Sequence, residues 1–190
     1  MNNIIEDQRY EKIDFTLTHF DILEYTNCHF INCNFSNCDL SNARFIDCTF
    51  KDCNLSLARL ANTAIQDVTF TGCKLLGLRF EDCDTFNLQF SFYHSNLNDC
   101  SFYKSKIKKT VFSACSLANV DFSNADLSQS SFSDCDLQAA RFELSNLEKV
   151  DFRTAYNFTI DPENNKLKKA KFSLQGLIGL VEKYDIQVSS

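Results

Sequence analysis

The chain has 190 residues and a net charge of −6, with 19 Phe, ten Cys, one Pro and no Trp. This length suits a single domain that buries its own core, and the net charge disfavours binding to the phosphates of nucleic acid. No basic stretch followed by an apolar run opens the sequence, so we expect no signal peptide and no membrane span. We therefore expect a cytoplasmic protein whose cysteines stay reduced.

From Tyr10 onward, a large apolar residue recurs at every fifth position. The series breaks at Thr85 and resumes, two residues out of step, from Leu97 to Phe152. Small side chains stand two residues before these centres, and all ten cysteines occupy that position. A period of five fits neither a helix nor an ordinary strand. We therefore predict square coils with five residues to a side, in which the centre and the small residue point inward and coils stack about 4.8 Å apart.

Coils of four sides predict a second period of twenty residues, and the sequence shows it. One predicted column is aromatic throughout: Tyr10, Phe30, Phe50, Phe70, Phe90, Phe112, Phe132 and Phe152. The next column reads Phe15, Phe35, Leu55, Leu75, Leu97, Leu117 and Leu137. The columns stay continuous only if the slip near residue 90 is an insertion of two residues. Stacked rings and buried apolar area would stabilise such a core.

Units such as ADLSQ at 125–129 and CDLSN at 38–42 resemble the pentapeptide repeat family, and the resemblance extends over residues 10–172. It implies an all-β solenoid, a right-handed quadrilateral β-helix of pentapeptide repeats with a C-terminal α-helix. We expect the β-helix to occupy residues 1–172, with a two-residue register slip near 85–92 and a widened turn near 157–166.

The spacing of the cysteines indicates small buried side chains and not a metal site. Zinc sites use closer cysteine pairs and histidines at ligand spacing, which this sequence lacks. We therefore expect no metal and no cofactor. One column, Cys33, Cys53 and Cys73, has a predicted separation compatible with a disulfide, so oxidation in vitro is an open alternative.

Near the slip, the bulky residues Leu88 and Phe90 fall where small inward residues are expected, so the coil must bulge. Insertions in solenoids map to surface loops, which often bind partners. Phe86, Phe92 and Tyr93 are the candidate contacts of this bulge. A kink without function is the alternative.

The five-residue frame continues through a poor patch, with centres at Asn157 and Pro162, and returns to the aromatic column at Phe172. Ser173 suits a helix N-cap, and apolar residues follow it at helical spacing. Asp185 begins a short stretch, DIQV, that we expect to form a strand. Residues 173–190 are therefore predicted to form a C-terminal helix and a short strand.

This ending resembles that of the quinolone-resistance pentapeptide proteins, the Qnr family. The resemblance rests on the DFRTA unit at 151–155, the turn at Asp161, the amphipathic helix and the terminal Ile-x-Val. In that family the last helix and strand make a symmetric dimer, which implies a homodimer here. The implied dimer contacts are Leu174, Leu177, Ile178, Val181, Tyr184, Ile186 and Val188. A helix that only caps the open coil is the alternative.

The sequence does not favour an enzyme. His19, His29 and His94 are far apart in the predicted coil, and no nucleophile elbow or phosphate-binding loop is present. Acidic residues gather on the two adjacent sides centred on Phe20 and Tyr25, where basic residues also occur. The candidate acidic partner-binding surface consists of Asp21, Glu24, Asp39, Asp47, Asp67, Glu81, Asp82, Asp121 and Asp126.

The Qnr resemblance implies a rod that mimics DNA, binds DNA gyrase or topoisomerase IV and protects the enzyme against fluoroquinolones. It implies neither direct binding of nucleic acid nor association with a membrane. The alternative is a non-enzymatic scaffold for protein–protein interaction with another partner, because a fold does not fix a function.

Overall fold

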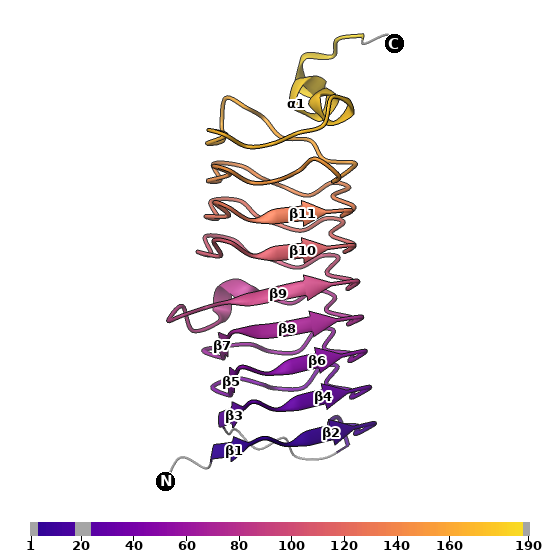
Figure 1. Cartoon of the computed structure of the whole chain (residues 1–190), viewed down its shortest axis with the longest axis vertical. Coiled ribbons are helices and arrows are strands. Elements are labelled where there is room, and N and C mark those ends of the chain that lie inside the picture. The colour runs from indigo at the N-terminus through magenta and orange to yellow at the C-terminus, as the bar shows by residue number, and fades with distance from the viewer. Residues whose placement is uncertain (1–3, 18–23, 188–190) are drawn as a thin grey trace.

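The computed structural model describes residues 4–17 and 24–187 and has the form of a rod, with the first and the last described residues at opposite ends (Figure 1). Its strands are short: β1 (Ile4–Glu6), β2 (Arg9–Glu11), β3 (Glu24–Thr26), β4 (His29–Ile31), β5 (Arg44–Ile46), β6 (Thr49–Lys51), β7 (Ala64–Gln66), β8 (Val68–Thr71), β9 (Phe90–Tyr93), β10 (Val111–Ser113) and β11 (Ser131–Ser133). The helices are also short: η1 (Phe80–Asp82), η2 (Gln175–Leu177), α1 (Ile178–Val181) and η3 (Glu182–Tyr184).

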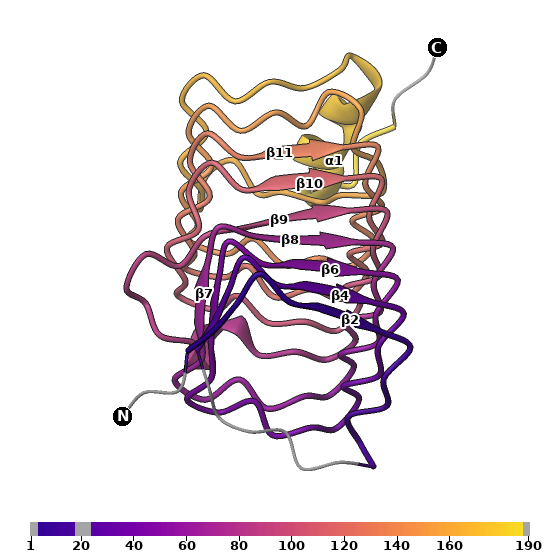
Figure 2. The same cartoon turned by 60° about the horizontal axis from the view of Figure 1, so that its bottom comes forward.

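Strands pair in parallel with the strand one coil away. One sheet has the order β1-β3-β5-β7 and the other β11-β10-β9-β8-β6-β4-β2. The remaining sides are linked by isolated parallel bridges, for example between Asn34 and Asn54 and between Asp121 and Arg141. Figure 2 shows the coils stacked around a common interior. The structure is therefore the predicted parallel β-solenoid with a short C-terminal helix.

Most sides end at a corner residue with positive φ, such as Asn32 (52°), Asn42 (63°) and Asp47 (53°). Asn, Asp and Gly tolerate this left-handed conformation best, which explains why they recur at the last position of the five-residue unit. Gly72 lies at such a corner with φ of 66°, and an added Cβ would also meet the carboxylate of Asp52 in the preceding coil. A residue in the left-handed conformation thus ends most sides of the coil.

The core contains an uninterrupted aromatic column whose neighbouring ring centroids lie 4.7–5.3 Å apart. Its members are Tyr10, Phe30, Phe50, Phe70, Phe92, Phe112, Phe132, Phe152 and Phe172. The prediction that Phe90 belongs to this column was wrong, because Phe70 pairs with Phe92. Phe90 instead pairs with Val68, at a position elsewhere held by small side chains.

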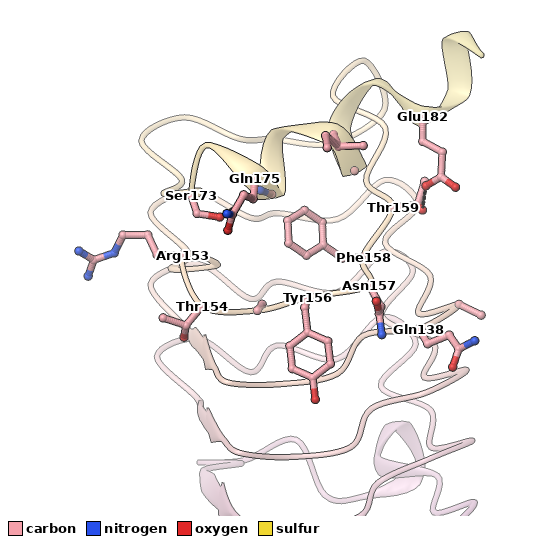
Figure 3. A pocket seen from close by; sticks show the side chains of 15 residues that line it. Gln138, Arg153, Thr154, Tyr156, Asn157, Phe158, Thr159, Ser173, Gln175 and Glu182 are labelled. Atoms are coloured by element: carbon pink, nitrogen blue, oxygen red, sulfur yellow. Dashed lines mark hydrogen bonds between the residues drawn. The ribbon is translucent and has the colours of Figure 1, made fainter. Parts of the chain in front are cut away.

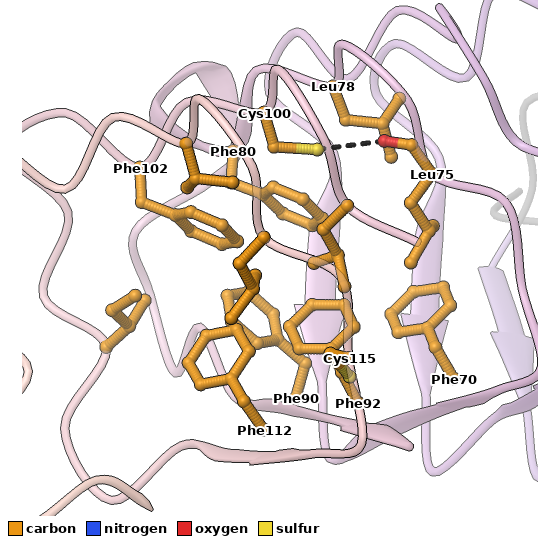
Figure 4. Close-up of a cluster of buried hydrophobic side chains, with 14 of the residues drawn as sticks. Phe70, Leu75, Leu78, Phe80, Phe90, Phe92, Cys100, Phe102, Phe112 and Cys115 are labelled. Carbon is orange, nitrogen blue, oxygen red and sulfur yellow. Dashed lines mark hydrogen bonds between the residues drawn. The ribbon is translucent and has the colours of Figure 1, made fainter. Parts of the chain in front are cut away.

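The two extra residues lie before β9, in the segment between η1 and Phe90. Strand partners are twenty residues apart on either side of this segment and twenty-two apart across it. The 3₁₀ turn η1 replaces a regular corner, and the chain then projects sideways as the bulge (Figure 2). Phe90 is buried against the rings of Phe80 and Phe102 (Figure 4). The core therefore closes around a side chain that the repeat pattern excludes from that position.

The last coil keeps its length but changes its inward residues. The bridges from Asp136 to Tyr156 and from Asn146 to Lys166 both span twenty residues. Between these bridges Phe158 and Ile160 are buried, whereas the predicted centres Asn157 and Pro162 are exposed. Placing those two residues at inward positions was therefore wrong.

The turn that follows Ile160 is closed by side chains of its own. Asp161 accepts hydrogen bonds from the backbone N–H of Glu163 at 2.9 Å and from the Asn164 amide at 2.7 Å. This leaves Phe158 and Ile160 as the apolar residues on which the terminal helix rests. None of the helices in the described residues is long and apolar enough to cross a membrane.

Candidate functional site

The terminal helix is fixed to the last coil by a close backbone approach. The Ile160 N–H donates to the Gly179 carbonyl at 2.9 Å. An added Cβ at Gly179 would lie 2.1 Å from the Phe158 carbonyl oxygen, and one at Gly176 would lie 3.0 Å from the Phe158 ring. The Ser173 hydroxyl accepts a hydrogen bond from the Gly176 N–H at 3.0 Å, as expected of an N-cap. The two glycines that weaken an isolated helix are therefore what allow this one to dock.

A polar cluster ties the end of the helical segment to the turn beneath it. The Lys183 ammonium donates to the carboxylates of Asp161 and Glu163, and the Tyr184 hydroxyl donates to Glu163 at 2.8 Å. The hydrogen bonds from Lys183 hold the pKa of both carboxyls below their usual values. All of these groups lie at the surface, so the cluster orients the segment more than it stabilises the fold.

Apolar side chains remain exposed at this end of the rod. Leu174 is 86% exposed and Ile178 is 52% exposed, and Leu177, Tyr184 and Ile186 are exposed as well. Val181 is partly buried, and Val188 lies outside the described residues. Residues 186–187 form no strand, so the expected terminal strand is absent from the described part of the segment. The structure thus gathers most of the implied dimer contacts at one end, where none of the described residues covers them.

A groove of about 880 Å³ runs beneath the terminal helix, on the side of the rod (Figure 3). Tyr156, Phe158 and Ile178 supply its apolar lining, and Arg153, Gln175 and Glu182 supply polar groups. Tyr156 is half exposed and points outward near Asn157. The groove adjoins the exposed apolar end and extends it into one continuous surface.

Most of the predicted acidic surface is paired with basic residues of the same chain. Six of its carboxylates form ion pairs: Glu24 with Arg44, Asp39 with Arg59, Glu81 and Asp82 with Arg79, Asp121 with Arg141, and Asp126 with Lys108, at 2.9–3.4 Å. Asp47 lies at an exposed corner, Asp67 accepts a hydrogen bond from the Gln89 amide, and Asp21 lies outside the described residues. The surface therefore presents less free negative charge than its carboxylates suggest.

Acids and amides that precede the centres also have a structural role. The carboxylate of Asp126 accepts from the Ser128 N–H at 3.1 Å, and Asn34 and Asp39 act in the same way on Ser36 and Ser41. Each such bond closes the turn at the end of a side. This explains why Asp and Asn recur at this position without forming catalytic pairs.

The cysteines behave as small buried groups. Nine of the ten are buried, Cys38 is intermediate, and all are free thiols. The Cys48 thiol donates to the Tyr25 carbonyl at 3.2 Å, a bond that the Thr63 hydroxyl makes in the same way to Leu40. Burial raises the pKa of Cys48 and of Cys100 to about 12, so these thiols stay protonated and unreactive. Within residues 4–17 and 24–187, no group of His, Cys, Asp and Glu is arranged to hold a metal ion.

The bulge presents one exposed aromatic side chain and not the three that were predicted. Phe86 is 66% exposed, and its backbone carbonyl accepts a hydrogen bond from the Gln66 amide. Phe92 is fully buried in the aromatic column, so its assignment as a contact residue was wrong. Tyr93 is partly exposed at the end of β9, directly before the corner at His94. The bulge is therefore a small feature compared with the apolar end.

Comparisons with known proteins agree with this architecture. The model of the family described as "Pentapeptide repeat region" matches residues 23–91 and 79–152. The structure of a trypsin-treated form of QnrB1, a plasmid-mediated fluoroquinolone resistance protein, is similar over 98% of this chain and 100% of that chain, with 20% identity and a TM-score of 0.64. The structure of full-length QnrB1 is similar over 97% of this chain and 100% of that chain, with 19% identity and a TM-score of 0.61.

HetL, a pentapeptide repeat protein involved in heterocyst differentiation regulation from Nostoc sp. strain PCC 7120, is also similar in structure. The similarity covers 92% of this chain and 88% of HetL, with 15% identity and a TM-score of 0.59. No match was found among curated protein sequences. The family match spans more than half of the chain and coincides with the stacked five-residue coils. The chain therefore belongs to the pentapeptide repeat family.

Proposed function

We propose that two copies of this chain join through their terminal segments and that the resulting rod binds a type II topoisomerase, DNA gyrase first, in place of DNA. Such binding would protect the enzyme against fluoroquinolones. The observation that carries the proposal is the end-to-end structural likeness to QnrB1, which extends through the terminal helix. At 20% identity, this likeness supports a shared fold and not a shared partner, so the partner is part of the proposal.

The dimer is supported by the apolar end of the rod. Folded monomers seldom leave a cluster such as Leu174, Leu177 and Ile178 open to water at one end of the core. The same surface of a second copy offers matching apolar side chains, and a two-fold contact of this kind is the commonest form of protein assembly. The groove beneath the helix provides a recess for side chains of the second copy.

The charge distribution supports binding by the outer arms of such a dimer. Residues 1–90 hold 13 acids and seven bases, whereas residues 91–190 hold 12 of each, so the whole net charge of −6 belongs to the first half. Joining two copies at their C-terminal ends places the acidic halves at the two tips. Negative arms of this kind complement basic surfaces that normally hold DNA.

The dimer is tested with the double variant Leu177→Glu, Ile178→Glu, whose molar mass is measured by light scattering. We expect the wild type to be a dimer at micromolar concentration and the variant to be a monomer with an unchanged circular dichroism spectrum. A monomeric wild type would reject the dimer.

The partner is tested with purified DNA gyrase in supercoiling and ciprofloxacin-cleavage assays. We expect the wild type to reduce drug-dependent cleavage and the double variant Asp47→Asn, Asp67→Asn to lose much of this effect. Both residues occupy positive-φ corners, where Asn is equally suited, so the coil is preserved. The control is Asp99→Asn with Asp134→Asn, which changes the net charge equally at corners of the other half. No effect of the wild type on cleavage would reject the topoisomerase as partner.

A scaffold for a different protein partner is the second candidate. It is favoured by the internal pairing of the predicted acidic surface, in which Arg59, Arg79 and Arg141 neutralise their neighbours. The structural likeness to HetL, which has a regulatory involvement, is consistent with such a role. A stable dimer that leaves gyrase unaffected would favour this scaffold.

A further inference from the structure

One side of the rod changes the sign of its charge at the bulge. This side carries the sheet β1-β3-β5-β7 in the first half of the chain and continues C-terminal to the bulge through bridges that link Lys106, Asp126, Asn146 and Lys166 (Figure 1). Its outward positions in the units 105–109, 125–129, 145–149 and 165–169 are here named the lysine face. The lysines of this face are Lys106, Lys108, Lys109, Lys149, Lys166, Lys168 and Lys169.

These lysines are largely unneutralised. The carboxylates on the face are Asp126 and Glu148, and only Lys108 of the face has an ion pair among the described residues, with Asp126 at 3.2 Å. The face therefore holds seven positive and two negative groups within a chain whose net charge is −6. On the N-terminal side of the bulge, the same side of the rod carries Asp47 and Asp67 at its corners.

Three of the four corner positions of the lysine face are lysines. Lys109, Lys149 and Lys169 have φ of 60°, 60° and 61°, and Gln129 between them has 66°. Asn27, Asp47 and Asp67 hold the corresponding corners before the bulge, as the left-handed conformation favours. Lysine has no such preference. Corners elsewhere also hold residues without this preference, such as Leu57, Ala139 and Leu144, so the conformation permits lysine without selecting it. What distinguishes this edge is that three of its four corners are cationic.

We propose that the lysine face binds a short acidic segment of a protein partner. Four coils stacked about 4.8 Å apart place the first and last rows of lysines about 14 Å apart, which matches about five residues of an extended peptide. N-terminal to the bulge the side becomes negative, so a longer polyanion such as duplex DNA would be repelled by Asp47 and Asp67. This inference does not depend on the topoisomerase, and a short acidic segment is the ligand that fits both the length and the charge.

The test uses a fluorescein-labelled hexaglutamate peptide and measures its anisotropy with the full-length protein at low salt. We expect the wild type to bind and the triple variant Lys109→Asn, Lys149→Asn, Lys169→Asn to bind at least about tenfold more weakly, because three of the charges that hold the peptide are lost. Asn suits the corner conformation, and thermal unfolding verifies that the variant is folded. The matched control is Lys12→Asn, Lys51→Asn, Lys74→Asn, which removes the same charge from other sides and includes the positive-φ corner of Lys12.

A short duplex DNA and a hexaglutamine peptide are measured alongside. Weaker binding of the duplex and no binding of hexaglutamine support the proposal. Absence of hexaglutamate binding, equal losses in the two triple variants, or tighter binding of the duplex through the same lysines would overturn it. The gyrase assay relies on Asp47 and Asp67 instead, so failure of one proposal is distinguishable from failure of the other.

Discussion

The rod contains two irregular stretches, the bulge and the last coil, and they depart from the repeat in different ways. The bulge adds two residues to a coil and still restores the aromatic column, because Phe92 takes the central position and Phe90 fills the neighbouring small one. The last coil adds no residues but replaces its inward side chains with Phe158 and Ile160. The first change leaves one exposed aromatic ring, Phe86, whereas the second creates a platform for a helix with an uncovered apolar face.

This difference indicates where interaction can arise in a stacked coil. An insertion is absorbed at a corner because the coils on either side impose their own register. A change at the terminal coil has no further coil to correct it, so the exposed edge must be covered by new contacts. The end of the rod is therefore a stronger candidate for assembly than the bulge.

The largest expected effect is on the free energy of unfolding, and it distinguishes the buried Phe92 from the exposed Phe86. Phe92→Ala removes a fully buried ring from the column and should lower the free energy of unfolding by about 3–5 kcal/mol. Phe86→Ala, the matched control, should change it by no more than about 0.5 kcal/mol. Urea denaturation followed by circular dichroism measures both. Similar losses in the two variants would mean that the bulge packs differently.

The next prediction concerns the contact between the terminal helix and the last coil. Gly179→Val places side-chain atoms against the Phe158 carbonyl and should destabilise the docked helix by about 1–3 kcal/mol. Faster proteolysis between residues 173 and 187 would report the release of the helix. Asp185→Asn, at an exposed position of the same segment whose positive φ also suits Asn, serves as control and should leave the cleavage rate unchanged. A helix that stays protected in Gly179→Val would contradict the close approach.

A smaller effect on the docking of the terminal segment is expected when the pH is lowered. Hydrogen bonds from Lys183 lower the pKa of Asp161 and Glu163 in the folded protein. A carboxyl with a lowered folded pKa contributes stability above its unfolded pKa and loses it as the pH falls through the folded value. The docked segment should therefore become more protease-sensitive as the pH falls through and below the usual carboxyl range, measured with an acid-active protease. Lys183→Gln should show a flatter dependence, and an identical dependence in both proteins would exclude this cluster as the cause.

The smallest expected effect tests the corner conformation of the lysine face. Lys149→Asn should stabilise the fold by roughly 0.5–1 kcal/mol, because Asn tolerates the positive φ of 60° better than Lys. Lys168→Asn removes the same charge at a neighbouring position that is not a left-handed corner and should have a smaller effect. Thermal unfolding of the two variants is compared. Equal shifts would assign the change to charge and not to backbone conformation.

The sequence by itself determined the repeating part of the molecule. A period of five within a period of twenty predicts which side chains of the regular coils enter the core. The same pattern predicted buried cysteines, since a position that admits only small groups recurs in every coil. These features are local and repeat many times, so each unit supports the assignment of the others.

The tertiary structure decided what the repeat does not specify. The exchange of Phe90 for Phe92 depends on how the chain crosses the bulge, and the inward turn of Phe158 depends on the helix that covers it. The twenty-residue period aligns Asp39 with Arg59 and Asp121 with Arg141, but the structure shows that these side chains form ion pairs and so neutralise part of the acidic surface. The packing of Phe90 and that of Phe158 each occur once in the chain, and for that reason no periodic signal predicts them.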